Sequence, residues 1–238
     1  MYCQERNNIL LKTPPAYRNV CLMNDAPSIV EVTIRGETAQ LVLSGEPEAL
    51  TLPAEIVRAG NLAPGVQLTP SQWTQLKETA ERYHCDQSAM QLLAVREHST
   101  GELRLKLRRK GFARQVIEVV VRRMTAIGAV DDVRYAHLVG QSLLQRRPCS
   151  RAYLSAHLQR RHVPRELAES VAEVLLGDTD ELALAEAALG QRRSLSQFEL
   201  ETARRKAYNY LARRGFGFEA ARIAFERWYK QLHQESHD

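Results

Sequence analysis

The sequence predicts a mainly α fold, an elongated tandem array of three three-helix repeats preceded by a small N-terminal module that contains a β-hairpin. Three observations support this expectation. After residue 86 the apolar residues recur every three to four positions, as on one face of a helix. A short basic segment occurs three times, at spacings of 51 and 53 residues. Residues 29–43 instead alternate between apolar and polar, which is typical of strands.

The composition is that of a globular protein, since 44% of the 238 residues are hydrophobic and 26% are charged. No apolar run approaches the ~20 residues of a membrane span, and the N-terminus lacks a secretory cleavage site. We therefore expect a cytoplasmic protein that contacts no membrane. The cysteines Cys3, Cys21, Cys85 and Cys149 are widely spaced without a CxxC pair. This spacing favours reduced thiols over a disulfide framework or a zinc site, and we expect neither a metal nor a cofactor.

Charge is unevenly distributed along the chain. Residues 1–85 contain 7 Lys/Arg and 9 Asp/Glu, a net charge of −2, whereas residues 86–238 contain 26 and 19, a net charge of +7. A basic segment joined to a slightly acidic one suggests a polyanionic partner, or a partner surface rich in acidic side chains. A basic surface that is only solvated is the alternative.

The first 85 residues divide into a leader and a module. Residues 1–28 show no sustained periodicity, so we expect a flexible leader. Residues 29–85 begin with two alternating runs around the turn Arg35-Gly36-Glu37, which predicts a hairpin. Thr69-Pro70 is typical of a helix cap and its first residue. The alternating apolar positions are Val30, Val32 and Ile34, then Ala39, Leu41 and Leu43; a third strand at 49–52 and a short helix from Pro53 to Gly60 are expected to follow.

The remaining chain reads as three related units, expected at residues 86–132, 133–180 and 181–238. The segments LKLRRKGF, LQRRHV and LARRGF can be aligned so that one leucine, one arginine and one apolar residue fall in register in each unit. The middle unit has His162 where the other two have glycine. A helix is expected before each segment, at 89–96, 134–147 and 182–193. The residues in register are Leu107, Leu158 and Leu211; Arg109, Arg160 and Arg213; and Phe112, Val163 and Phe216.

Local signals define the first unit in more detail. Ser99 and Glu102 fit a capping box at a helix start, and residues 196–199 suggest the same in the third unit. Leu103 and Leu107, one turn apart, are expected to face the core. The structural residues expected at the helix ends are Gly111 and Phe112 at a left-handed stop, Gly215 and Phe216 at the equivalent stop, and Asp131 and Asp132 at the start of the next helix.

With those leucines inward, the basic residues of the first unit should point outward, and a second basic cluster lies in the third unit. Basic runs on exposed helices are commonly no more than solvated. Two such runs at equivalent positions of a repeat favour a shared binding face that neutralises phosphates or meets acidic side chains. The expected basic face comprises Arg96, Arg104, Lys106, Arg108, Arg109, Lys110, Arg114, Arg122 and Arg123, with Arg204, Arg205, Arg213 and Arg214.

Sites for catalysis are weakly indicated. His98, just before the helix cap, could sense a phosphate, although a structural role is commoner at such a position. Neighbouring His84 and Cys85 lack further ligands nearby, and Asp131-Asp132 reads as a helix cap rather than a carboxylate pair. No P-loop, GxSxG, HExxH or dinucleotide motif is present. The aromatic residues near the C-terminus are predicted to be core or a lid on the last repeat in preference to a base-stacking platform; they are Phe225, Trp228 and Tyr229. We do not expect an enzyme.

Three stretches taken together resemble the RecX family of recombination regulators. They are REHSTGELRLKLRRKGF (96–112), GAVDDVRYA (128–136) and LARRGFGFEAARIAF (211–225), in that order and at the spacing of the family. The resemblance covers about residues 86–230 and extends more weakly into the β-rich segment. The departures are His162 in place of glycine and Ala129-Val130 where a leucine is common.

The resemblance implies a protein that binds the RecA recombinase, chiefly as its filament on single-stranded DNA. It implies lower ATPase, strand-exchange and coprotease activity of RecA, and so a tempered SOS response and DNA repair. Binding in the filament groove and capping of the filament end are both implied modes. We expect a monomer that binds single- or double-stranded DNA weakly by itself. The alternative is a helical regulator that acts directly on duplex DNA, because a three-helix unit with a glycine turn resembles a helix-turn-helix.

Overall fold

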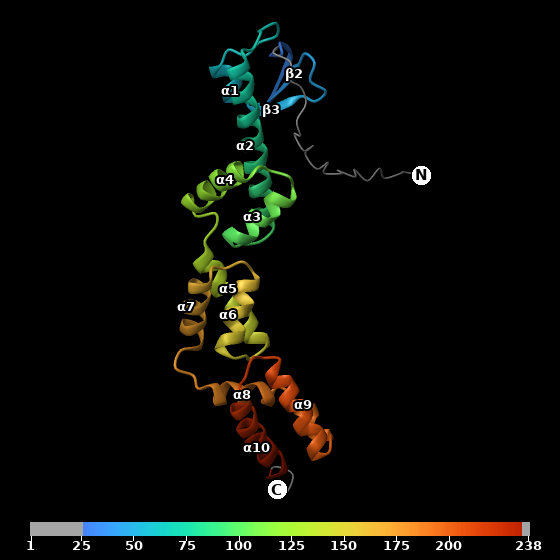
Figure 1. Cartoon of the computed structure of the whole chain (residues 1–238), viewed down its shortest axis with the longest axis vertical. Coiled ribbons are helices and arrows are strands. Elements are labelled where there is room, and N and C mark those ends of the chain that lie inside the picture. Colours follow the sequence, from blue (N-terminus) through green and yellow to red (C-terminus); the bar gives the residue numbers. More distant parts are fainter. Residues whose placement is uncertain (1–25, 235–238) are drawn as a thin grey trace, which may run out of the picture. The chain divides into compact units, whose positions relative to one another are not determined.

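The computed structural model describes residues 26–234, which form a three-stranded sheet followed by helices (Figure 1). The mainly α fold with a small β module at its start is therefore confirmed. Two compact units are present. The first holds the described residues up to Arg96 together with Leu103–Ala129, and the second holds Glu97–Glu102 together with the described residues from Val130 onward. Cys3, Cys21 and nearly all of the expected leader lie outside the described residues.

The sheet is antiparallel in the order β1-β2-β3, with β1 Ile29–Arg35, β2 Thr38–Leu43 and β3 Leu50–Pro53. Gly36 has φ +62° in the two-residue loop between β1 and β2, which is where a type II′ hairpin turn needs a positive φ. The alternating face of β2 is buried. In β1 an irregularity between Ile29 and Glu31 shifts the register, so Ile29 is buried while Val30 and Ile34 are exposed.

Two helices complete the module, α1 Ala54–Ala59 and α2 Pro70–Val95. Thr69 caps α2: its side chain accepts from the backbone N–H of Gln72, and the Gln72 side chain accepts from that of Thr69. Helix α2 runs through residue 85, where the sequence suggested a module boundary. The helix expected at 89–96 is therefore the C-terminal part of this 26-residue helix, and no glycine or proline interrupts it.

The helices that follow α2 in the first unit are short. They are α3 Thr100–Arg109, whose first turn groups with the second unit, and α4 Arg114–Ala126. The second unit continues with α5 Asp132–Arg146, α6 Arg151–Arg160, α7 Arg165–Leu176, α8 Glu181–Gly190, the 3₁₀ helix η1 Arg193–Gln197, α9 Leu200–Ala212 and α10 Phe218–Gln234. Helix α9 has Glu199 at its N-cap without a side-chain cap bond. Ser196 instead lies in η1 and donates to the carbonyl of Arg193, so the capping box expected at 196–199 is wrong.

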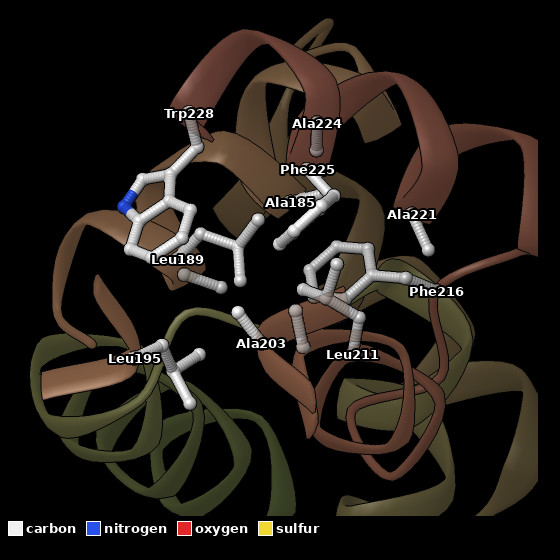
Figure 2. Close-up of a cluster of buried hydrophobic side chains, with 12 residues drawn as sticks. Ala185, Leu189, Leu195, Ala203, Leu211, Phe216, Ala221, Ala224, Phe225 and Trp228 are labelled. Carbon is white, nitrogen blue, oxygen red and sulfur yellow. The ribbon is translucent and has the colours of Figure 1, made fainter. Parts of the chain in front are cut away.

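The second unit has two apolar clusters. One packs α5, α6 and α7 through residues such as Leu154, Leu158 and Ala172. The other packs α8, α9 and α10, and Figure 2 shows Phe225 and Trp228 pointing into it. Trp228 is only 6% exposed, which identifies it as a core residue.

The three aligned segments adopt one backbone turn. In each, the amide of the apolar residue donates to the carbonyl of the leucine five places earlier, at 3.4, 3.2 and 3.2 Å. This bond is typical of a Schellman motif, whose preceding residue is left-handed. That residue has φ +94° at Gly111, +62° at His162 and +79° at Gly215. His162 therefore takes the glycine conformation, and the middle unit keeps the geometry of its neighbours.

Candidate functional site

The basic stretch that the sequence singled out lies on α3 and the turn after it. Leu103 and Leu107 are fully buried on one side of the helix. Arg108 and Arg109 are exposed. The other basic residues of this stretch are half-buried: Arg104, Lys106 and Lys110.

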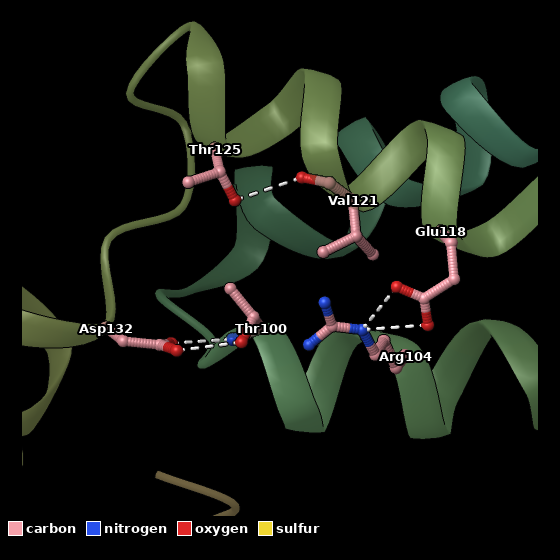
Figure 3. A network of polar contacts seen from close by, with 6 residues as sticks. All are labelled: Thr100, Arg104, Glu118, Val121, Thr125 and Asp132. Atoms are coloured by element: carbon pink, nitrogen blue, oxygen red, sulfur yellow. Dashed lines mark hydrogen bonds and ion pairs between the residues drawn. The ribbon is translucent and has the colours of Figure 1, made fainter. Parts of the chain in front are cut away.

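Two arginines of the expected basic face are paired with carboxylates inside the first unit. Arg104 Nε donates to both carboxylate oxygens of Glu118 at 3.1 Å, which joins α3 to α4 (Figure 3). Arg123 on α4 pairs with Asp86 on α2. Both arginines therefore hold helices together, and their charge is partly neutralised. Surface pairs of this kind contribute about 0–1 kcal/mol to stability.

The exposed arginines of α3 and α4 are the stronger candidates for partner contact in the first unit. Apart from Arg123, which pairs with Asp86, they are Arg108 and Arg109 at the end of α3 and Arg114 and Arg122 on α4. Arg96, just after α2, is also exposed. Arg108 and Arg109 lie in the last turn of a helix, where cations also offset the negative end of the helix dipole.

In the third repeated segment, the expected residues divide into exposed and structural ones. Arg205 and Arg213 are exposed, whereas Arg204 pairs with Glu201 at 2.9 Å. The Arg214 guanidinium lies 4.7 Å from the ring centroid of Tyr210 and donates to the carbonyl of Pro148. Arg214 is therefore anchored within the second unit.

In each of the three repeats, two adjacent basic residues precede the left-handed residue of the turn. The pair is Arg109-Lys110 in the first, Arg160-Arg161 in the second and Arg213-Arg214 in the third. Arg160 falls in register in the aligned segments, but neither residue of the middle pair belongs to the basic face expected from the sequence. Arg160 and Arg161 are exposed, and the Arg160 guanidinium lies 5.6 Å from the Tyr153 ring centroid. The register itself was the signal that could have included them.

The same turns also serve as joints within the second unit. Ser99 Oγ donates to the carbonyl of Arg161 at 2.7 Å and accepts from the amide of Glu102 at 3.1 Å. Ser150 repeats the arrangement, because its amide donates to the carbonyl of Arg214 and its hydroxyl accepts from the amide of Tyr153. Each serine therefore caps a helix and docks that helix start on the turn of a later repeat.

Close packing accompanies these serines. A Cβ on Gly101 would lie 2.6 Å from the His162 carbonyl oxygen, and one on Gly215 would lie 2.5 Å from Ser150 Oγ. Asp132 also holds the helix start beside Ser99. Its carboxylate accepts from the amide and the hydroxyl of Thr100, each at 2.7 Å (Figure 3). The sequence indicated Asp132 only as a favourable charge at a helix start.

A glutamate side chain caps the helix that follows the repeated turn in the first and third of the three repeats. Glu81 of α2 accepts from the amide of Ala113, and Glu181 of α8 accepts from the amide of Gly217, at 2.9 and 2.8 Å. The equivalent residue of the middle unit is Pro164, which has no N–H to satisfy. Sequence reasoning missed both glutamates because each lies more than thirty residues from its partner.

The remaining expected structural residues lie at helix starts or in the core. His98 is 2% exposed. Its burial favours the structural role that the sequence gave as the commoner one. Asp131 caps α5 by accepting from the amides of Val133 and Arg134. These hydrogen bonds lower the pKa of its carboxyl, and the bond from Arg134 has the larger effect. Glu102 accepts from the Tyr135 hydroxyl at 3.3 Å. Phe112 and Phe216 are buried.

The reactive side chains of the described residues are poorly placed for chemistry. Burial, with Asp86 and Glu81 nearby, raises the pKa of the Cys85 thiol to about 12, and burial raises that of Cys149 to about 11. Both thiols are therefore protonated at neutral pH and weak nucleophiles. Burial also lowers the pKa of His84. No group of three His, Cys, Asp or Glu side chains within the described part of the chain is arranged to hold a metal ion.

Helix α2 is long but too polar to cross a bilayer, and no other helix of residues 26–234 combines the length and the apolar character that a membrane span requires.

Comparison with known proteins identifies relatives of one kind. Residues 87–124 match the family model for RecX, first three-helix domain. The regulatory protein RecX of Pelodictyon phaeoclathratiforme is 32% identical over 137 residues, which make up 57% of this chain and 83% of that protein. The regulatory protein RecX of Syntrophotalea carbinolica is 35% identical over 136 residues, or 54% of this chain and 86% of that protein.

Two solved structures share the fold. The crystal structure of a regulatory protein RecX matches with a TM-score of 0.63, covering 84% of this chain and 99% of that chain at 14% identity. The structure of RecX from Lactobacillus salivarius matches with a TM-score of 0.50, covering 62% of this chain and 96% of that chain at 16% identity. At such identities the likeness concerns the fold alone.

Proposed function

The chain belongs to the RecX family of regulatory proteins, and from that premise we propose that it binds the RecA recombinase, above all as the filament on single-stranded DNA. Binding lowers the ATPase, strand-exchange and coprotease activities of RecA and so restrains the SOS response and DNA repair. The protein acts in the cytoplasm as a monomer, without a cofactor and without catalysing a reaction of its own.

The observation that carries this proposal is the basic pair before the left-handed turn of each repeat. An arginine recurs at one position of the turn, at Arg109, Arg160 and Arg213, and all three are exposed. One such residue needs no explanation beyond the helix dipole. Three at one position of a repeat favour contacts with regularly spaced charges, as on the phosphates or acidic side chains of a helical filament.

Charge reversal at equivalent positions of two repeats tests this proposal. We expect Arg109→Glu with Arg213→Glu to weaken binding to RecA filaments on labelled single-stranded DNA by tenfold or more at moderate salt. Fluorescence anisotropy measures the affinity, with a non-hydrolysable ATP analogue holding the filament intact. The affinity of the unmodified protein should itself fall as salt rises, because neutralised phosphates release counterions.

The matched control is Arg35→Glu with Arg146→Glu, which changes the net charge equally at exposed positions outside the repeated turns. It should bind filaments nearly as well as the unmodified protein. An equal loss in both double variants would mean that net charge alone drives binding. No loss in either would remove the basic pairs from the proposal.

Direct action on duplex DNA is the second candidate function. The observation in its favour is that three-helix units present exposed arginines, as helix-turn-helix proteins do. Such a protein needs one recognition helix with side chains that read bases, and here the exposed arginines are distributed over repeats. A sequence-specific footprint on duplex DNA in the absence of RecA would favour this candidate.

A further inference from the structure

A groove in the first unit has a chemistry unlike that of the basic turns. It has a volume of about 730 Å³, which lies in the size range of ligand-binding pockets. Its walls come from the β1–β2 turn, α1, α2 and α4, and we call it the α2–α4 groove. It therefore lies between the β module and helices α2 and α4 of the same compact unit.

Part of the groove lining is apolar and open to solvent, beside polar and charged side chains. Met90 of α2 and Val119 of α4 are each 49% exposed, and Ile127 at the end of α4 is 60% exposed. These three side chains belong to the groove lining together with the half-buried Ile56 and Tyr83. Exposed apolar side chains scattered singly are common on proteins, but several in one concave site are typical of a binding surface.

The charges that line the groove balance. Three arginines and three carboxylates contribute to its walls, so no excess of positive charge attracts a polyanion. A nucleic-acid backbone would bring phosphates against the carboxylates, whereas a peptide can offer both signs. The arginines are Arg58, Arg82 and Arg123, and the carboxylates are Glu37, Glu55 and Asp86.

One polar atom of the wall lacks a partner. Asp86 pairs with Arg123 through Oδ2, while its Oδ1 is buried and is the buried side-chain oxygen without a hydrogen bond among the residues described. A buried carboxylate oxygen without a hydrogen bond costs free energy, because it has lost its contact with water. The Arg123 side chain is 64% exposed. An occupant of the groove therefore has access to this guanidinium.

We propose that the α2–α4 groove docks a protein segment with apolar side chains flanked by charges of both signs, in preference to nucleic acid. This inference rests on the proposed function, which makes RecA the protein that supplies the segment. The basic turns and the groove then have different roles: the turns contact phosphates or acidic side chains, and the groove contacts the protein component of the filament.

The test removes apolar surface without changing charge. Val119→Ser with Ile127→Ser should weaken binding to RecA filaments by about tenfold, the factor expected for loss of ~1.4 kcal/mol of apolar contact. Affinity for naked single-stranded DNA and the thermal unfolding temperature should stay unchanged. The matched control is Val133→Ser with Val174→Ser, which are 51% and 66% exposed in the second unit and lie outside the groove.

Each outcome has a defined meaning. Unchanged filament affinity in the groove variant would overturn the proposal. An equal loss on naked DNA would reassign the groove to nucleic acid and also overturn it. Should the groove variant unfold at lower temperature, Met90→Ser on α2 provides the same test from a different helix. If the unmodified protein itself fails to bind the filament, the proposed function fails first and the groove proposal falls with it.

Discussion

At the scale of single residues, the left-handed position of the three repeated turns has the same backbone conformation in each repeat. Glycine occupies it in the first and third repeats, and histidine occupies it in the second. Gly111 and Gly215 adopt a positive φ without a Cβ to obstruct it, whereas His162 adopts φ +62° with one. An L-residue in the left-handed region costs roughly 1–2 kcal/mol. The hydrogen bond from Val163 to Leu158 and the packing of Val163 must offset this cost.

His162→Gly should therefore stabilise the protein. Relief of the left-handed strain contributes about 1–2 kcal/mol, and the greater flexibility of glycine in the unfolded chain takes back about 0.5–1 kcal/mol. The expected gain in the free energy of unfolding is roughly 0.5–1 kcal/mol, measured by urea denaturation. His162→Ala is the control and should leave stability nearly unchanged, because it retains the Cβ. Equal stability of the glycine and alanine variants would contradict a strained turn.

His157 on α6 links stability to pH. Burial lowers its pKa, and Arg161 and Arg160 lower it further. The unfolded chain then binds a proton more readily, near pH 6.5, than the folded chain does. The free energy of unfolding should fall as the pH drops from 7.5 to 5.5. His157→Gln should show a flatter dependence in urea denaturation over that window; an identical slope in the variant and the unmodified protein would contradict the lowered pKa.

At the scale of secondary-structure elements, the sequence repeat is accompanied by a repeated contact between the start of one helix and the turn of the next repeat. The serines Ser99 and Ser150 each cap a helix and donate a hydrogen bond to a backbone carbonyl in the turn of a later repeat, Ser99 from its hydroxyl and Ser150 from its amide. A steric overlap in such a contact involves backbone atoms, which cannot move aside by a rotamer change as a side chain can. Gly101 is the residue that this close approach requires in the first joint.

Gly101→Ala tests that joint. An alanine in the first turn of a helix normally gains up to about 1 kcal/mol over glycine. Here its Cβ would meet the backbone oxygen of His162, and overpacking costs about 1–3 kcal/mol. We therefore expect a net loss of stability in urea denaturation. Gly190→Ala in α8 is the matched control, since nothing lies within 4 Å of its Cβ position. Equal stabilisation by both substitutions would contradict the joint.

The sequence was sufficient to predict elements whose signals are local. Periodicity identified the helices, alternation identified the hairpin, and the register of Leu107, Leu158 and Leu211 identified the three turns. Contacts between distant residues could not be predicted in this way. The caps from Glu81 and Glu181 and the hydrogen bond from Thr100 to the Asp132 carboxylate each join residues at least 32 positions apart.

Two further differences have physical causes in neighbouring elements. Helix α2 continues through the expected boundary because its interior contains neither glycine nor proline. The expected basic face separates into exposed and paired residues, because carboxylates on other helices neutralise Arg104 and Arg123. Residue types alone gave no indication of these partners.

At the scale of the whole molecule, the exposed arginines of the repeated turns and the α2–α4 groove are separate features. The chain has a net charge of +5, with a small acidic excess before residue 86 and a basic excess after it. Exposed arginines recur at the turns of the repeats, while the charges of the α2–α4 groove balance. Under the proposed function, the turns would contact phosphates or acidic side chains of the filament, and the groove would contact its protein component.

Titration of RecA ATPase activity on single-stranded DNA tests the central claim most directly. The protein is added from far below the RecA concentration up to equal concentration, and its binding to naked DNA is measured alongside. The account predicts inhibition at substoichiometric amounts together with weak binding to naked DNA. Unchanged ATPase activity at equal concentration, with tight binding to duplex DNA, would contradict it.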